Sequence, residues 1–311
     1  MKKIFYQLIS EAEKNRPDIV LLMDYPDFNL RLARQLKSMG IKVFYYISPQ
    51  VWAWRKSRIH DIKAYCEKVF LLFPFEKKFY ETYQVPYEFV GHPLLDDLNP
   101  DLFNIDKINF QRSRYGIQSH EKVLALMPGS RRGEVDQHFQ IQQAVARNLL
   151  KMHNHLRILI CVAPPLSKEY MIQKLENFNL PYILLKEDPN HMIAISDYVL
   201  VASGTATLMV GLLEKPMVIM YKMNWITGVI GNFLTRGLKF FGLVNLILDE
   251  EVVPERKQQF VQVDELTKLM NRFIVDSTYT RKTIEKLKIL KTSLGDRGAN
   301  GRVVSALNKY L

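Results

Sequence analysis

The sequence predicts an α/β protein of two doubly wound domains, each built on a parallel β-sheet. Short runs of apolar residues, typical of strands covered on both faces, alternate with amphipathic segments typical of helices. This alternation stops in a polar, turn-rich stretch near residues 91–119 and then starts again. A chain of 311 residues with 48% hydrophobic residues is long enough to form two such cores.

The first predicted domain covers residues 1–95. Its strands are expected at residues 19–23, 41–47, 68–73 and 87–90, and its helices at 4–15, 28–38, 55–64 and 75–83. A doubly wound domain usually opens with a strand and a glycine-rich turn, whereas this chain opens with a helix. We therefore expect that the opening strands of this domain are missing from the chain.

Residues 96–120 are interpreted as the connection to a second domain over 121–295, followed by a C-terminal helical segment over 296–311. Strands are expected at 123–127, 156–162, 182–185, 198–201 and 217–221, and helices at 133–152, 167–176, 205–213, 225–240, 263–275, 279–292 and 299–310. Ligands of open parallel sheets bind at the carboxyl ends of the strands, so two such domains predict an active site in a cleft between them.

The composition restricts the function classes. The net charge of +11 predicts attraction to an anionic membrane surface or to phosphorylated substrates, and we expect no nucleic-acid partner. Cys66 and Cys161 have no metal-ligand or redox spacing, and the histidines show none either, so we expect no metal and no cofactor. Neither a signal peptide nor a spanning helix is indicated, which favours a cytoplasmic protein.

The first candidate motif is Asp24-Tyr25-Pro26-Asp27-Phe28-Asn29, at the end of the first predicted strand. Pro26 is expected to hold Tyr25 extended, and Asp27 is interpreted as a helix N-cap. Asp24 is not needed for that cap, so its carboxylate is a candidate catalytic group; the alternative is a second turn-forming aspartate.

A second motif, Ser48 to Arg55, follows the second strand and contains Trp52 and Trp54. Aromatic faces next to Arg55 suit a sugar ring or a phosphorylated head group, although core tryptophans beside a solvated basic helix explain the pattern equally well. His92 is the other residue placed near the cleft, with a hydrogen-bonded linker histidine as the alternative.

Two loops of the second domain join a strand to a helix. The run Pro128-Gly129-Ser130-Arg131 offers small residues, a helix N-terminus and a guanidinium suited to phosphate. The run Ser203-Gly204-Thr205-Ala206-Thr207 repeats the arrangement with hydroxyl groups. Each loop alone is also consistent with an ordinary capped helix, but together they predict a nucleotide diphosphate site.

Taken together, these motifs resemble those of the lipid-A-disaccharide synthases. The matching runs occur in family order over nearly the whole chain: residues 24–29, 48–54, 73–76, 90–93, 128–131, 202–208 and 216–218. The resemblance implies a metal-independent, inverting glycosyltransferase with the two-domain GT-B fold. The implied reaction joins UDP-2,3-diacylglucosamine to 2,3-diacylglucosamine 1-phosphate, also called lipid X, and releases UDP.

The resemblance also implies residue roles. Asp24 would be the general base, Gly129, Ser130, Arg131 and residues 203–207 would hold the diphosphate, and Asn245 matches a family asparagine near the site. Three features depart from the family. The first strand with its Gly-Glu-x-Ser-Gly-Asp-type loop has no counterpart, Met209 replaces a glutamate that holds the UDP ribose, and residues 254–258 read Pro-Glu-Arg-Lys-Gln. These departures predict weaker UDP binding.

Three interpretations remain open from the sequence. The chain is an active synthase, completed by a separate N-terminal piece or given with a misplaced start; or an inactive or regulatory relative; or another GT-B enzyme, such as an epimerase. A homo-oligomer is a further expectation for the active form. An active synthase is expected to act peripherally on the cytoplasmic face of the inner membrane. Residues 225–241 form a basic amphipathic pattern that suits such a surface or a buried helix.

Overall fold

The computed structural model describes residues 2–52, 55–222 and 239–311. These residues form two compact units. Unit 1 contains the described residues of 2–97 and 292–311, and unit 2 contains those of 98–222 and 239–291.

Unit 1 is built on a four-stranded sheet in the order β1-β2-β3-β4, with every neighbouring pair parallel. The four strands follow the four predicted apolar runs, so this part of the prediction is confirmed. Its elements are α1 (Lys2–Asn15), β1 (Ile19–Met23), α2 (Pro26–Ser38), β2 (Lys42–Tyr46), α3 (Arg58–Tyr65), β3 (Lys68–Leu71), α4 (Glu76–Thr82), β4 (Tyr87–Phe89), the short 3-10 helix Pro93–Leu95 and α14 (Ala299–Leu307).

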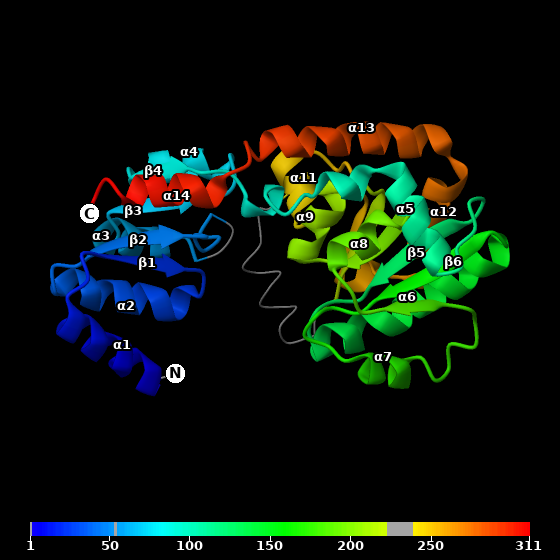
Figure 1. The fold of residues 1–311 in the computed structure, drawn as a ribbon, viewed down its shortest axis with the longest axis horizontal. Helices are drawn as coiled ribbons and strands as arrows, with labels where there is room; N and C mark the ends of the chain where they lie inside the picture. The colour runs from blue at the N-terminus through cyan, green and yellow to red at the C-terminus, as the bar shows by residue number, and fades with distance from the viewer. Residues whose placement is uncertain (1, 53–54, 223–238) are drawn as a thin grey trace. The chain divides into compact units, whose positions relative to one another are not determined.

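Both faces of this sheet are covered, which explains why its strands are continuous apolar runs. Val43 and Tyr45 of β2 belong to the core formed with α2 and α3. Phe44, on the opposite face, packs against Tyr310 with ring centroids 4.7 Å apart. The C-terminal segment with α14 therefore covers the second face of unit 1 (Figure 1).

Unit 2 has a six-stranded, wholly parallel sheet in the order β10-β9-β8-β5-β6-β7. This order confirms a second doubly wound domain. Its elements are a 3-10 helix (Pro100–Phe103), α5 (Ile105–Arg114), β5 (Lys122–Met127), α6 (Arg132–Met152), β6 (Leu156–Cys161), α7 (Lys168–Lys174), β7 (Ile183–Leu185), α8 (Pro189–Ala194), β8 (Tyr198–Ala202), α9 (Thr205–Leu212), β9 (Met217–Tyr221), α11 (Leu243–Leu248), β10 (Glu255–Lys257), a 3-10 helix (Gln258–Phe260), α12 (Val263–Val275) and α13 (Ser277–Ser293).

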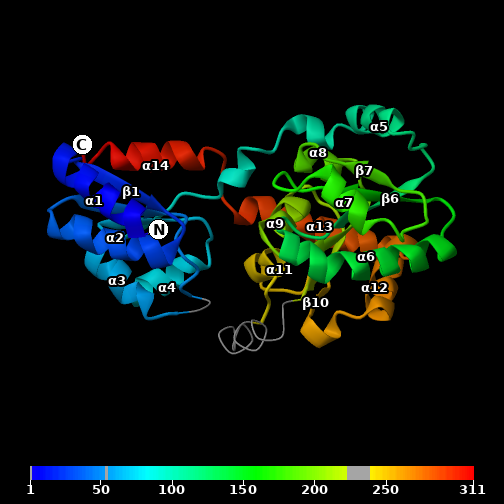
Figure 2. The ribbon, with the colours of Figure 1, turned by 90° about the horizontal axis from the view of Figure 1, so that it is seen from below.

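Helices enclose this sheet from both sides (Figure 2). The core on one face joins α6, α7 and α12 to the strands. On the other face Gly211 of α9 lies so close to Val244 of α11 and Leu290 of α13 that an added Cβ would stand 2.8 Å from each side chain. Glycine at position 211 thus permits close approach of three helices over the sheet.

Besides the short 3-10 helices, four of the described elements were not predicted from the sequence: α5, α8, α11 and β10. Helix α5 lies within the stretch interpreted as a loose connection, and none of its residues is buried, so its apolar periodicity is weak. Strand β10 is the charged run Glu255-Arg256-Lys257, which becomes a strand because it pairs with the edge of β9. Of the predicted helix over 225–240, residues 225–238 lie outside the described residues.

Candidate functional site

The candidate residues of unit 1 lie at one edge of its sheet. Asp24 follows β1, Ser48 follows β2, Phe73 follows β3 and His92 follows β4. Because all four strands are parallel, their carboxyl ends share this edge, where ligands of open α/β sheets bind.

Asp24 presents an exposed carboxylate at this edge. Among the described residues, no hydrogen bond or ion pair engages that carboxylate. The carboxylate of Asp27, by contrast, pairs with the guanidinium groups of Arg55, at 2.9 Å, and Arg58. Asp24 is therefore the acidic group of the motif that is available to a ligand.

Two local predictions for this motif were wrong. Tyr25 is not extended, since its φ of 43° and ψ of 60° place it in the left-handed region. Asp27 is not the N-cap of α2, because Tyr25 occupies that position and no side chain caps the helix there. Pro26 begins the helix directly, and the turn before it takes a left-handed backbone instead of the extended one expected before proline.

A buried carboxyl group joins the loops after β2 and β3. Glu76 is 2% exposed and accepts hydrogen bonds from Trp52 Nε1 and Phe73 N, both at 3.1 Å. The Trp52 ring packs edge-on against Phe75, and Phe73 lies beside the buried His92. Trp52 and His92 are thus brought to one cluster, whereas Trp54 lies outside the described residues.

No role was predicted for Glu76, although it ends the run Phe73-Pro74-Phe75-Glu76. A glutamate within an aromatic run is the signal that could have indicated a buried carboxyl group. Burial raises the pKa of Glu76 to about 7, and burial lowers the pKa of His92 to about 4. Both groups are therefore held toward their neutral forms at this edge.

Glu76 should make the stability of unit 1 depend on pH. Because its pKa is higher in the folded state, its contribution to stability is present below about pH 4.5 and is lost as the pH rises through 7. Removing it by Glu76→Gln should remove this dependence. The unfolding free energy of the wild type relative to Glu76→Gln is expected to fall on the order of 3 kcal/mol between pH 4.5 and 7.5.

Chemical denaturation across this pH range measures the difference. The matched control is Glu13→Gln in the exposed part of α1, which should follow the wild-type curve. A constant difference between wild type and Glu76→Gln over the whole range would contradict the assignment of a raised pKa to this carboxyl group.

In unit 2 the loop after β5 carries Gly129, Ser130 and Arg131. Its backbone amides are bonded within the protein, because Glu134 Oε2 accepts from Ser130 N at 2.8 Å and from Arg131 N at 3.3 Å. The group that this loop offers to an anion is the Arg131 guanidinium. Its side chain is 85% exposed, and its ion pair with Glu134 is 3.6 Å long.

The loop after β8 forms the start of α9. Gly204, Thr205 and Ala206 are exposed at that helix N-terminus, and Ser203 is half-buried. The hydroxyl group of Thr207 is instead buried and donates to Gly204 O at 2.8 Å, so it closes the first turn. The amide of Ser203 donates to Met220 O at 2.8 Å, so Ser203 offers an anion only its hydroxyl group. Free amides at a helix N-terminus favour an anion, which leaves the amides of residues 204–206 and the Ser203 hydroxyl as the candidate phosphate contacts.

His138 connects the loop after β5 to the segment after β9 and was not singled out in the sequence. It is 1% exposed in α6, and its Nε2 accepts from Lys222 N at 3.0 Å. The Nδ1–H can then donate to Pro128 O, 3.1 Å away, which fixes the neutral tautomer. Strands β5 and β9 flank β8, so His138 ties the two outer loops on either side of the loop at 203–207.

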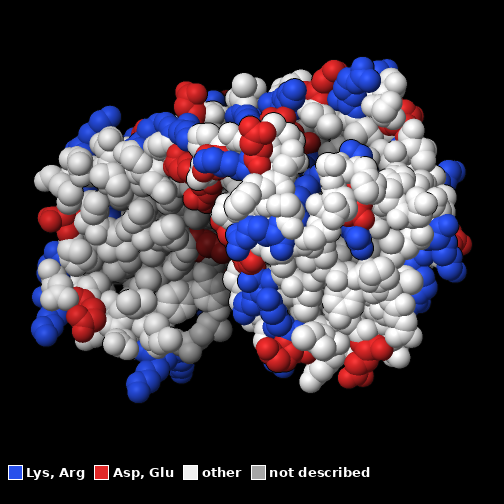
Figure 3. Space-filling view, turned by 45° about the vertical axis from the view of Figure 1, so that its right-hand side comes forward, with Lys and Arg blue, Asp and Glu red and all other residues white. Residues whose placement is uncertain are grey.

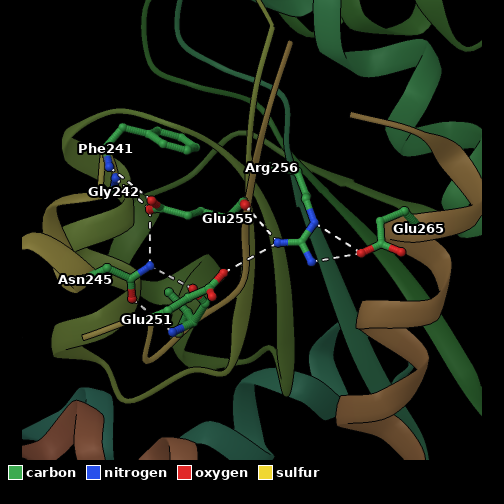
Figure 4. A network of polar contacts seen from close by, with 8 residues as sticks. Phe241, Gly242, Asn245, Glu251, Glu255, Arg256 and Glu265 are labelled. Atoms are coloured by element: carbon green, nitrogen blue, oxygen red, sulfur yellow. Dashed lines mark hydrogen bonds and ion pairs between the residues drawn. The ribbon is translucent and has the colours of Figure 1, made fainter. Parts of the chain in front are cut away.

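Asn245 is a buried structural residue in this arrangement (Figure 4). It is 0% exposed, its Nδ2 donates to Val253 O and Glu255 Oε2, and its Oδ1 accepts from Val253 N. Glu255 also accepts from the amides of Phe241 and Gly242. The side-chain amide is therefore used to join α11 to β10.

Asn245→Ala should destabilise unit 2 by about 2–4 kcal/mol, since it leaves the Val253 amide and carbonyl unpaired inside the core. Urea denaturation measures the loss. The exposed Asn177→Ala is the matched control and should change the unfolding free energy by less than about 0.5 kcal/mol. Equal stability of the two variants would contradict the structural role.

Four further features concern the predicted ribose position, the surface charge, metal ligands and membrane-spanning helices. Met209 is 6% exposed in α9. In the face drawn in Figure 3, Lys and Arg side chains lie in several separate groups with Asp and Glu between them. Within the described residues no three His, Cys, Asp or Glu side chains are grouped to hold a metal ion. No described helix has the length and apolar character needed to cross a membrane.

Two parallel sheets, each sandwiched by helices and each with candidate residues on its carboxyl edge, define an α/β protein of the GT-B class. Solved structures with this fold include the UDP-GlcNAc 2-epimerase of Neisseria meningitidis bound to UDP-GlcNAc, with a TM-score of 0.68 and 16% identity over 99% of this chain and 81% of that one. Another is HepE of Anabaena in complex with UDP and glucose, with a TM-score of 0.60 and 12% identity over 98% and 81%.

The family follows from sequence comparison. The family model described as lipid-A-disaccharide synthetase matches residues 1–300. Lipid-A-disaccharide synthase 1 of Legionella pneumophila is 37% identical over 96% of this chain and 77% of its own length. The synthase of Geobacter sulfurreducens is 33% identical over 100% and 80%.

The chain belongs to the lipid-A-disaccharide synthetase family, and it is a glycosyltransferase of the UDP-sugar-dependent kind. The resemblance and the GT-B-like fold predicted from the sequence motifs are confirmed.

Proposed function

We propose that this protein transfers 2,3-diacylglucosamine from UDP-2,3-diacylglucosamine to lipid X, with Asp24 as the general base. Family membership over residues 1–300 supports the reaction. The observation that carries the residue assignment is the exposed carboxylate of Asp24, which no described residue engages, at the carboxyl edge of a parallel sheet.

In the proposed reaction, the 6-hydroxyl oxygen of the acceptor attacks the anomeric carbon of the donor while the Asp24 carboxylate takes the hydroxyl proton. The new bond forms between that oxygen and the anomeric carbon. The bond to the β-phosphate oxygen breaks, and its electron pair leaves with UDP. Attack opposite to the leaving group inverts the configuration of the anomeric carbon.

The leaving diphosphate needs positive charge and hydrogen-bond donors. We assign these to the Arg131 guanidinium and to the amides of residues 204–206 at the start of α9. Preorganised donors of this kind stabilise the charge that develops on the leaving group. Trp52, Arg55 and His92 are proposed to lie near the acceptor, on the edge that also carries Asp24.

The ribose contact remains a prediction. Met209 is a thioether and cannot accept a strong hydrogen bond from a ribose hydroxyl. If this position faces the ribose, Met209→Glu should tighten UDP binding, and unchanged affinity in calorimetry would remove the contact from the proposal.

The proposed place of action is the cytoplasmic face of the inner membrane. Donor and acceptor both carry acyl chains, and the net charge of +11 favours an anionic surface. Peripheral association fits a protein that reaches substrates held in such a surface.

The test is an assay of the purified chain with UDP-2,3-diacylglucosamine and lipid X. The expected products are UDP and a β-linked tetraacyl disaccharide 1-phosphate in equal amounts, identified by mass spectrometry. UDP binding without disaccharide would favour a regulatory relative that does not catalyse transfer, and would overturn the proposal.

A further inference from the structure

The turn that carries Asp24 has an unusual backbone. Asp24 and Tyr25 have φ values of 49° and 43°, so two consecutive residues with side chains adopt the left-handed conformation. This conformation costs an L-residue about 1–2 kcal/mol, and it persists only where neighbouring groups enforce it. Residues held in this way concentrate at active sites.

Two buried side chains hold the turn through one atom. The carbonyl oxygen of Asp24 accepts from the Tyr45 hydroxyl at 2.5 Å and from Asn29 Nδ2 at 2.7 Å. Asn29 Nδ2 also lies 2.8 Å from Met23 O. Tyr45 is 0% exposed and Asn29 is 9% exposed, so both donors are fixed by the core of unit 1.

Hydrogen bonds also hold the carbonyl group of Tyr25, the next residue. The carbonyl oxygen of Tyr25 accepts from the amides of Phe28 and Asn29, as the first bonds of α2. Burial raises the pKa of Tyr45, so its hydroxyl keeps the proton that it donates. Hydrogen bonds thus hold the backbone carbonyls of Asp24 and of Tyr25, while the Asp24 carboxylate stays exposed.

We infer that Asn29 and Tyr45 are positioning residues for Asp24. They touch neither substrate and act through the backbone around Asp24. Both donate to the Asp24 carbonyl, and Asn29 also donates to Met23 O, so together they set the direction of the Cα–Cβ bond and therefore the position of the carboxylate. This inference rests on the proposed role of Asp24 as general base. A base displaced by about 1 Å can lose on the order of a hundredfold in rate.

The experiment is a double-mutant cycle measured by transfer rate. Tyr45→Phe removes only the hydroxyl, and Asn29→Leu replaces the amide by an apolar group of similar shape. Each should lower kcat by about 10- to 100-fold and leave KM for both substrates within about twofold. In the Asp24→Asn background, the same changes should have no further effect on the residual rate.

A control separates positioning from loss of stability. Leu36→Ala removes a buried side chain of α2 away from the turn, so it should lower the melting temperature and leave kcat unchanged. If Leu36→Ala lowered kcat as much as Tyr45→Phe, the kinetic loss would reflect stability alone, and the inference would fail.

Three other outcomes are also decisive. Unchanged kcat in folded Tyr45→Phe and Asn29→Leu, or an equal loss in the Asp24→Asn background, would overturn the positioning role. Full activity of Asp24→Asn alone would instead overturn the base assignment, so the two failures can be told apart.

Discussion

Asp24→Asn is expected to lower the transfer rate by about 10²- to 10⁴-fold while leaving the affinity for UDP within about twofold of the wild type. The amide keeps the size of the carboxylate but cannot take the proton of the acceptor hydroxyl. The UDP contacts are assigned to unit 2, so they should not change. Radiolabelled product formation measures the rate, and isothermal titration calorimetry measures the affinity.

The matched control for this substitution is Asp18→Asn. Asp18 is an exposed carboxylate just before the amino end of the same strand, β1, at the edge opposite to Asp24. Loss of a surface charge there should change neither rate nor affinity measurably. A full transfer rate in Asp24→Asn would show that another group accepts the proton.

Gly129→Ala is expected to weaken UDP binding at least tenfold, which corresponds to about 1.4 kcal/mol. Gly129 has a φ of 127°, and a Cβ at this position would stand 2.6 Å from Glu134 Cβ and 2.7 Å from Glu134 Oε2. The first of these atoms is not the flexible end of the side chain, so the loop itself must move. Arg131 would move with it.

Gly133→Ala provides the control four residues further along. An added Cβ there meets nothing within 4 Å, and the position lies in the first turn of α6. Alanine favours a helix over glycine, so this variant should bind UDP as the wild type does and be slightly more stable. If folded Gly129→Ala bound UDP as tightly as Gly133→Ala, the loop after β5 would not hold the diphosphate.

The elements predicted best from the sequence are those whose burial imposes a clear pattern. The strand Ile19–Met23 and the helix Val263–Val275 have the predicted bounds, because continuous apolar runs and 3.6-residue periodicity follow directly from burial. Strand β10 could not be predicted this way, since its charged residues form a strand only through pairing with β9.

In the candidate site, too, some features follow from local sequence patterns, whereas others depend on contacts with other elements. The positions of Asp24 and of the two helix-start loops follow from strand ends, which the sequence pattern locates. The partners of Asn245 and His138 belong to other elements: Val253 lies 8 residues from Asn245, and Lys222 lies 84 residues from His138, so local patterns carried no signal for them. The left-handed backbone at Asp24 and Tyr25 could likewise not be predicted, because the hydrogen bond that stabilises it comes from Tyr45 in β2.

The most direct test of the account is an experimental structure of the full chain with bound UDP. We expect the diphosphate to contact the Arg131 guanidinium and the amides of residues 204–206, at the carboxyl edge of the six-stranded sheet. A diphosphate bound away from both loops would contradict the account.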